Sequence, residues 1–324
     1  MSLDVAQSIE LASYVGAGLC IGLGAIGAAL GEGYTAGLAN RAISLKEEKS
    51  GDIMKTMLVG QAVAESAAIF ALVIAILLIF MSFPGESLLA AASLIGAGLC
   101  MGFGAVGSGA GSGFPAGQAC LGMARQPAVS GKLTTNMLIG SAVCQTPAIF
   151  SMVVALMLMF MKFDHLPLEP TWAALIGAGL STGLAAIGSG FGGGLTAGAS
   201  CEGIARTPET MGPVTTTMLV GQAVSQTPAI FGLLVSFILM FKAFPESSAL
   251  AAAMAPMGAG LCMGFGGIGP GVGNGYTAEK AVKWIARNSD ASGILTRTML
   301  VGQAVSQSTA IYAMVVSLVL VFVI

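Results

Sequence analysis

The stretch Gly16-Ala17-Gly18-Leu19-Cys20 decides the fold, because the chain repeats it three more times at intervals of 80 or 81 residues. The later copies begin at Gly96, Gly177 and Gly258, and the copy at Gly177 ends in serine instead of cysteine. A second stretch, residues 59–70, recurs at 139–150, 220–231 and 301–312. Repetition at a fixed period indicates one structural unit used several times. We therefore predict four tandem helical hairpins, here called hairpins 1 to 4, which span residues 1–84, 85–166, 167–246 and 247–324.

The composition indicates a membrane protein. Of the 324 residues, 55% are hydrophobic and only 9% are charged, whereas soluble domains carry about 25% charged residues. A helix needs about 20 apolar residues to cross a bilayer. We predict an all-α membrane protein with eight transmembrane helices, two in each hairpin, and no surface for nucleic acid. The predicted spans are 11–38, 57–82, 88–123, 137–161, 172–204, 218–241, 249–284 and 298–324.

Basic residues gather in the loops inside the hairpins, with Lys46, Lys132, Arg206 and Lys283 among them. The connections between hairpins carry proline and acidic residues instead. Loops rich in Lys and Arg stay on the cytoplasmic side of a membrane. We therefore expect cytoplasmic hairpin loops and both chain termini on the outside.

The first helix of each hairpin is rich in closely spaced glycines. The stretch from Gly22 to Gly27 fits the GxGxxG pattern of dinucleotide-binding proteins, but that pattern needs a strand before it and a helix after it. Small residues at helical spacing instead let membrane helices approach closely. We expect the first helices to pack side by side as a tight inner layer, as in a ring.

Glu65 stands inside an apolar run that extends from Met57 to Phe80. A carboxylate at the centre of a membrane helix costs about 2.5–3.5 kcal/mol and is functional by default. Gln61 lies one turn earlier on the same face, and the adjacent Ser66 supplies a hydroxyl. Such oxygen donors suit a hard cation. We expect Glu65 to bind a cation or a proton; the alternatives are a structural carboxylate and a misplaced span.

Glu32 lies on the loop side of the first helix, so an antiparallel hairpin brings it to the depth of Glu65. Two carboxylates this close in a low dielectric cannot both stay charged, so one is protonated or both share a cation. The alternative is a solvated charge near the helix end.

Hairpins 2 to 4 lack both carboxylates. Glutamine replaces Glu65 in each of them, at Gln145, Gln226 and Gln307. The position of Glu32 is taken by Ser112, Gly193 and Asn274. A neutral amide cannot be charged and discharged by an ion, so we expect three passive hairpins. Pro147 and Pro228 are expected to kink two of the second helices.

The glycine-rich first helix, the polar loop and the motif from Gly60 to Ser66 resemble the c subunit (proteolipid) of rotary F-type and V-type ATP synthases and ATPases. The resemblance covers all four hairpins. It implies a non-enzymatic rotor subunit in a homo-oligomeric ring, a stator a subunit with an arginine that discharges the site, and central stalk subunits at the loops. It also implies a bacterial inner membrane.

The set Gln61, Val63, Glu65 and Ser66, with Glu32 as a further oxygen donor, looks like the sodium-binding branch of that family. The resemblance therefore implies Na+, or else H+, as the transported ion. In those relatives the cation lies between adjacent hairpins. The implied donors from a neighbouring chain are Val305, Ser308 and Tyr312.

Several alternatives stay open from the sequence. Hairpin 2 is another candidate donor, through Val143 and Thr146. With one site in four hairpins, a ring moves fewer ions in each turn. Each ion that crosses at 100 mV costs about 2.3 kcal/mol, so fewer ions per turn let the motor work against a steeper gradient. This favours ATP-driven ion pumping over synthesis. The other functional classes are an ion-coupled secondary transporter, whose repeats usually bring discontinuous helices to a midplane site, and a structural membrane proteolipid.

Overall fold

The computed structural model describes residues 4–85, 87–246 and 249–323, and this part of the chain contains helices and no strand. Residues 86, 247 and 248, which belong to the predicted connections between hairpins, lie outside it. The α-helices are α1 (Val5–Leu45), α2 (Ser50–Phe80), α3 (Leu88–Arg125), α4 (Ser130–Cys144), α5 (Thr146–Phe160), α6 (Leu168–Arg206), α7 (Met211–Ser225), α8 (Thr227–Phe241), α9 (Leu250–Ile285) and α10 (Ser292–Phe322). Short 3-10 turns at Glu47–Lys49, Pro127–Val129, Pro208–Thr210 and Ser289–Ala291 close the hairpins.

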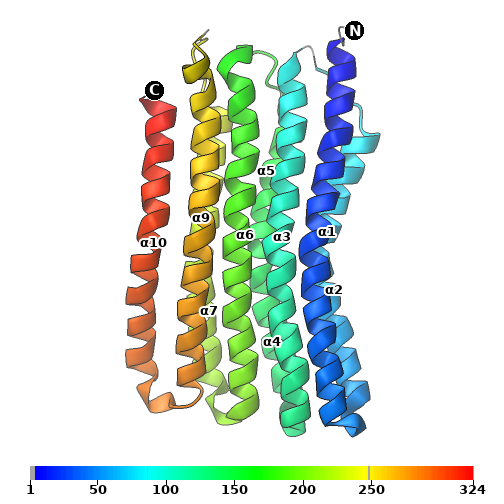
Figure 1. Ribbon diagram of the computed structural model, residues 1–324, viewed down its shortest axis with the longest axis vertical. Helices are drawn as coiled ribbons and strands as arrows, with labels where there is room; N and C mark the ends of the chain where they lie inside the picture. Colours follow the sequence, from blue (N-terminus) through cyan, green and yellow to red (C-terminus); the bar gives the residue numbers. More distant parts are fainter. Residues whose placement is uncertain (1–3, 86, 247–248, 324) are drawn as a thin grey trace.

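The helices form two layers. The first helices, α1, α3, α6 and α9, stand side by side in chain order (Figure 1). Behind them lie α2, the pair α4 and α5, and the pair α7 and α8, while α10 stands beside α9 at the end of the row. Within the described residues, eight helical stretches are long and apolar enough to cross a membrane. The predicted all-α fold of four hairpins is confirmed.

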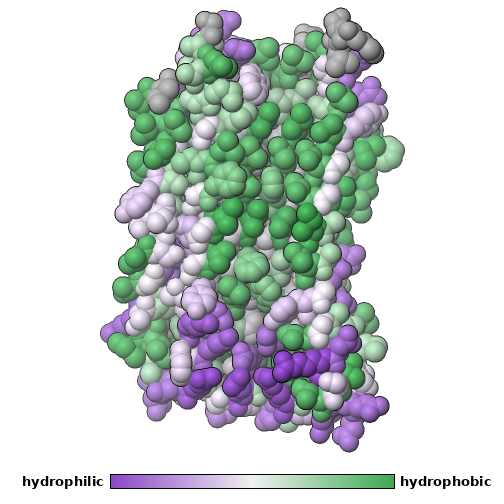
Figure 2. Space-filling model, in the orientation of Figure 1, coloured by the Kyte–Doolittle hydropathy of each residue, from purple (hydrophilic) through white to green (hydrophobic). Residues whose placement is uncertain are grey.

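All four hairpin loops lie at one end of the molecule, and the chain ends and the connections lie at the other (Figure 1). On the face formed by the first helices, apolar residues cover the middle and hydrophilic residues gather at the loop end (Figure 2). The basic loop residues therefore share one end, as the positive-inside argument requires.

The second helices of hairpins 2 and 3 are interrupted at the position of Glu65. Helix α4 ends at Cys144 and α5 begins at Thr146, so Gln145 stands at the break. Proline lacks a backbone N–H and its ring clashes with the carbonyl four residues earlier, which explains a break next to Pro147. Hairpin 3 repeats it at Gln226. These interruptions lie next to the two prolines that are expected to disturb their helices, whereas α2 and α10 run through this level without interruption.

Glycine backbones bring the first helices into direct contact. A Cβ atom on Gly113 of α3 would lie 2.3 Å from the carbonyl oxygen of Gly31 on α1. The same approach recurs between α3 and α6, where a Cβ atom on Gly107 would lie 2.3 Å from the Ile187 oxygen. Thr35 strengthens the contact, because its Oγ1 donates across to the Gly113 carbonyl at 3.1 Å. The prediction of a tightly packed glycine-lined layer is confirmed.

The row of first helices has two open edges. Gly18, Gly22 and Gly33 of α1 have open space around the position of a Cβ atom, as far as the described residues extend. Their equivalents in α3 are all blocked by the backbone or side chains of α1. At the other end of the row, Gly269 of α9 faces open space, although the equivalent Gly107 abuts α6. The open side of α1 therefore has the equivalents of the glycines that α3 uses to contact α1, and the open side of α9 has the equivalent of a glycine that α3 uses to contact α6.

Gly113→Ala should destabilise the fold, because the added methyl group collides with backbone that has no room to move. Overpacking of this kind costs about 1–3 kcal/mol. The measurement is the unfolding midpoint of the purified protein in detergent. Gly131→Ala is the matched control, because no described atom approaches the position of a Cβ on Gly131; equal midpoints for the two variants would contradict the packing argument.

Candidate functional site

Glu65 and Glu32 lie beside each other on hairpin 1. The Glu65 side chain projects from α2 and is exposed in the single chain, while Glu32 on α1 is half-buried. The two carboxylates are close enough to interact electrostatically. Gln61 connects their helices, since its Nε2 donates to the backbone carbonyl of Glu32 at 3.2 Å. The structure therefore brings together three of the residues proposed for the ion site.

The bond made by Gln61 recurs in every hairpin. Ser141 Oγ donates to the Ser112 carbonyl at 3.2 Å, and Gln222 Nε2 donates to the Gly193 carbonyl at 3.1 Å. In hairpin 4, Gln303 donates to the Asn274 carbonyl at 3.0 Å. The position of Gln61 thus connects the second helix to the first at the depth of the carboxylates.

Gln222 and Gln303 also reach the hairpin that precedes their own. Gln222 Nε2 lies 3.0 Å from the Gly140 carbonyl oxygen, and Gln303 Nε2 lies 3.1 Å from that of Gly221. Sequence reasoning missed these bonds between hairpins. The signal for them was the recurrence of glutamine at this position in three of the four repeats.

Gln145 bridges hairpins 1 and 2. Its Nε2 donates to the Val63 carbonyl at 2.9 Å and to Ser112 Oγ at 2.7 Å. Gln226 makes the equivalent bond one hairpin later, from Nε2 to the Val143 carbonyl at 2.9 Å. The residue that replaces Glu65 therefore points at a backbone carbonyl of the preceding hairpin.

Hairpin 4 departs from this pattern. Gln307 Oε1 accepts a hydrogen bond of 2.7 Å from Asn274 Nδ2, and that same nitrogen lies 3.4 Å from the Val224 carbonyl oxygen. Gln307 Nε2 is buried without a partner among the described residues. The Asn274 amide therefore makes the contact with hairpin 3 that a glutamine makes in hairpins 2 and 3.

Val63 and Ser66 belong to the side of hairpin 1 that meets hairpin 2. The Val63 carbonyl accepts from Gln145 and also from Ser66 Oγ, the latter at 2.6 Å. The structure therefore divides the five residues proposed on hairpin 1. Glu65, Glu32 and Gln61 form one group, and Val63 and Ser66 form another that faces the next hairpin.

The residues proposed as donors from a neighbouring chain lie on α10, at the opposite end of the row from α1 (Figure 1). Ser308 Oγ donates to the Val305 carbonyl at 2.7 Å, which reproduces the arrangement of Ser66 and Val63. Val305 is 70% exposed and Tyr312 is 65% exposed. Hairpin 4 therefore presents the same donor group to the outside that hairpin 1 presents to hairpin 2.

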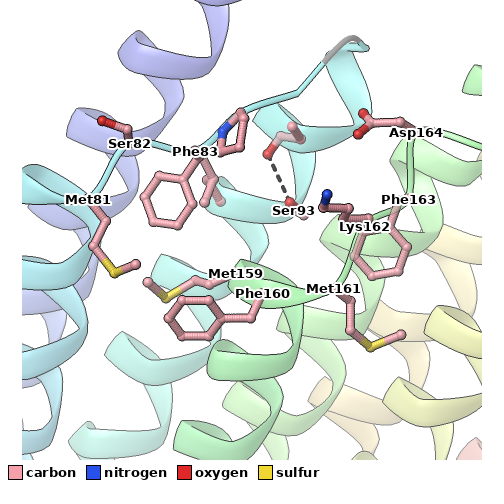
Figure 3. A pocket seen from close by; sticks show the side chains of 13 residues that line it. Met81, Ser82, Phe83, Ser93, Met159, Phe160, Met161, Lys162, Phe163 and Asp164 are labelled. Carbon is pink, nitrogen blue, oxygen red and sulfur yellow. Dashed lines mark hydrogen bonds between the residues drawn. The ribbon is translucent and has the colours of Figure 1, made fainter.

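A pocket of about 240 Å³ lies far from these groups, at the end opposite the loops (Figure 3). Met81, Phe83, Met159 and Phe163 form much of its wall. Its lining comes from the end of α5, the first turns of α3 and the two connections, and it includes no residue proposed for the carboxylate site.

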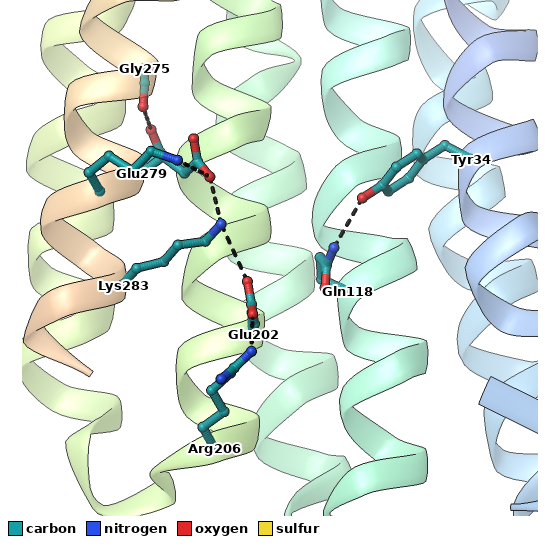
Figure 4. Close-up of polar contacts among 9 residues, drawn as sticks. Tyr34, Gln118, Glu202, Arg206, Gly275, Glu279 and Lys283 are labelled. Carbon is teal, nitrogen blue, oxygen red and sulfur yellow. Dashed lines mark hydrogen bonds and ion pairs between the residues drawn. The ribbon is translucent and has the colours of Figure 1, made fainter. Parts of the chain in front are cut away.

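Ion pairs connect α6 and α9 near the loop end (Figure 4). Lys283 Nζ lies 3.4 Å from a Glu202 oxygen and 2.6 Å from a Glu279 oxygen. Arg206 completes the group with a contact of 2.6 Å to Glu202. Sequence reasoning missed this cluster, although acid and base four residues apart on a helix were a usable signal. The cluster stabilises the pairing of hairpins 3 and 4.

Comparison with known proteins places the hairpins in one family. The family described as the C subunit of ATP synthase matches residues 15–78, 95–158, 176–239 and 257–320. An A-type ATP synthase subunit K from Methanocaldococcus jannaschii is 32% identical over 199 residues, which cover 61% of this chain and 83% of the relative. The ATP synthase c subunit of Natranaerobius thermophilus is 47% identical over 77 residues, or 24% of this chain and 88% of the relative. That of Alkaliphilus oremlandii is 46% identical over 70 residues, or 22% and 78%.

Proposed function

Because this chain belongs to the ATP synthase C subunit family, we propose that copies of it form a rotor ring that carries Na+ on Glu65. The chain is an integral membrane protein and a non-catalytic rotor subunit of a rotary ATP synthase or ATPase, as the resemblance implied. Members of this family form rings and translocate ions. We propose three further properties: Na+ as the ion, donors to the site from the neighbouring chain, and ion pumping driven by ATP hydrolysis.

The contact between Gln145 and the Val63 carbonyl carries the proposal. It identifies which parts of two successive hairpins meet at the depth of Glu65. For Glu65 to meet a backbone carbonyl in the way that Gln145 does, another hairpin must lie beside hairpin 1. Hairpin 4 of a second copy of the chain supplies it. The Glu65 carboxylate then faces the Val305 carbonyl and Ser308 Oγ, and a cation between these oxygens replaces the amide nitrogen that Gln145 uses.

The open edges of the row support this assembly. Gly33 would contact Gly273 of the preceding copy, as Gly113 contacts Gly31. Thr277 Oγ1 would donate to the Gly33 carbonyl, because Thr35 and Thr196 make the equivalent bonds at 3.1 Å each. A head-to-tail contact closes into a ring where its rotation returns to the starting copy, and we propose that this contact does so.

Gln61 would then donate to the Gly302 carbonyl of the preceding copy, as Gln222 and Gln303 do to the equivalent carbonyls within the chain. Tyr312 lies on the same exposed side of α10 as Val305. The alternative donor, Val143 with Thr146, is disfavoured because the Val143 carbonyl already accepts from Gln226.

The donor set favours Na+ over H+. A carbonyl, a hydroxyl and carboxylate oxygens form a hard oxygen environment that suits an alkali cation. Two carboxylates and one cation leave an excess negative charge, so Glu32 carries a proton while Glu65 binds the ion. A protonated Glu65 would donate one hydrogen bond and need one acceptor, whereas a cation would use both the Val305 carbonyl and the Ser308 hydroxyl.

The surroundings follow from the same family membership and from the charge pattern. The hydrophilic loop end (Figure 2) faces the cytoplasm of a bacterial cell and contacts the central stalk. An arginine on the stator a subunit discharges Glu65 as the ring turns. Hairpins 2 to 4 pass the stator without exchanging an ion, because their amides carry no charge.

Glu65 should react with a hydrophobic carbodiimide, and Na+ should slow the reaction, because a bound cation holds the carboxylate ionised and enclosed. The measurement is the mass of the peptide containing residue 65 after the purified oligomer is labelled with and without NaCl. Glu65→Gln should remove the adduct. Labelling of a monomer would favour a secondary transporter, and an unreactive Glu65 would favour a structural proteolipid.

Ser308→Ala should weaken the protection by Na+, because it removes a donor from the site between chains. Thr146→Ala is the matched control, since Thr146 is the equivalent residue of hairpin 2. The NaCl concentration for half-maximal protection should rise only for Ser308→Ala. The reverse result would place the donor on hairpin 2.

The reconstituted enzyme should move one Na+ per chain in each turn, a quarter of what four carboxylates per chain would carry. Fewer ions per ATP let the motor work against a steeper gradient, because each ion costs about 2.3 kcal/mol per 100 mV. Counting Na+ per hydrolysed ATP in vesicles tests this. Rapid ATP synthesis at an ordinary membrane potential would contradict the preference for pumping.

A further inference from the structure

We infer that the contact between hairpins 1 and 2 is a second site for a monovalent alkali cation, which the amide of Gln145 keeps closed. The inference rests on the proposed function, because it takes the contact at Glu65 as a cation site. It adds that the contact between hairpins 1 and 2 of a single chain retains every donor of such a site except the carboxylate. A carboxylate in place of the Gln145 amide is then sufficient to open it.

The Gln145 nitrogen satisfies two oxygens that would help to coordinate a cation. Two oxygens from different hairpins converge on it, the Val63 carbonyl at 2.9 Å and Ser112 Oγ at 2.7 Å. An amide NH2 group carries two hydrogens and satisfies two acceptors in this way. An alkali cation satisfies the same acceptors through its charge. The amide is therefore a built-in substitute for the ion.

The other half of the Gln145 amide indicates an incomplete site. Its Oε1 is buried and has no hydrogen-bond partner in the described part of the chain, and the residue is only 6% exposed. A buried acceptor without a partner is unfavourable. A glutamate at this position would place two oxygens where one nitrogen and one unpaired oxygen now lie, and a cation would pair with both.

The donors around Gln145 match those proposed for Glu65 in kind. Hairpin 1 provides the Val63 carbonyl and the Ser66 hydroxyl bonded to it. Hairpin 2 provides Ser112 Oγ at the position of Glu32. Because these three oxygens carry no net charge, a carboxylate and a cation together leave the site neutral, which the membrane interior requires.

The other two contacts inside the chain lack part of this set. Between hairpins 2 and 3, the position of Ser112 is Gly193, which has no side chain to contribute an oxygen. Between hairpins 3 and 4, the Asn274 amide lies between Gln307 and the Val224 carbonyl. The contact at Gln145 is therefore the one that a single substitution completes.

The experiment uses rings of the full chain in which Glu65→Gln removes the native carboxylate and Gln145→Glu supplies the new one. The probe is carbodiimide labelling with and without NaCl, read as the mass of the peptide containing residue 145. The expected result is an adduct whose formation slows roughly tenfold when Na+ is present at ten times its dissociation constant, by simple competition. The control is Gln226→Glu in the same background, which should label with much weaker protection because Gly193 contributes no oxygen.

Wild-type rings labelled in parallel separate this inference from the proposed function. In one outcome, Na+ protects Glu65 in the wild-type ring, but NaCl does not change the rate at which the double variant is labelled at residue 145. In another, Na+ protects the wild-type Glu65 and residue 145 of the double variant is not labelled at all. Either outcome contradicts the inference about Gln145 and is consistent with the proposed Na+ site at Glu65. A wild-type Glu65 without protection overturns the proposed binding of Na+ at Glu65. If the double variant forms no ring, the single variant Gln145→Glu is labelled and its adduct at residue 145 is subjected to the same comparison.

Discussion

The backbone contact between neighbouring first helices is the constraint on which the rest of the structure depends. A Cβ atom on Gly113 would lie only 2.3 Å from the Gly31 carbonyl oxygen, and Gly107 repeats this approach toward α6. Helices this close leave no freedom to slide or rotate, because small residues let the two backbones touch directly. The rotation and the depth of each hairpin relative to the next are thereby fixed.

This fixed relation makes every contact between hairpins a variant of one arrangement. In hairpins 2 and 3, the side chain at the position of Glu65 meets the hairpin before it. Gln145 and Gln226 donate an amide hydrogen to a backbone carbonyl there, whereas Gln307 contacts Asn274 instead. In the part of the chain that the structure describes, no hairpin lies before the one that carries Glu65. An ionised carboxylate cannot donate to a carbonyl, so in the ring proposed above a cation would have to connect Glu65 to the neighbouring copy.

Hairpins 2 to 4 use amide side chains to close the contacts between successive hairpins. Their amides satisfy buried carbonyls that would otherwise face an apolar contact, and burying such a group without a partner is costly. The proline breaks at Gln145 and Gln226 coincide with these bonds. Between hairpins 1 and 2, and between hairpins 2 and 3, a glutamine amide therefore closes the contact at the depth of Glu65.

The sequence by itself determined the number of hairpins, their membrane character and the single carboxylate at Glu65, because a repeat of 80 or 81 residues and the substitution of glutamine are visible without coordinates. It also placed Glu32 near Glu65 and the helix interruptions near Pro147 and Pro228, since these follow from local helix geometry. Only the tertiary structure decided that Val63 and Ser66 face hairpin 2, and that Gln222 and Lys283 connect successive hairpins. Spacing along one helix shows which residues share a face, but the partner of that face depends on how separate helices pack.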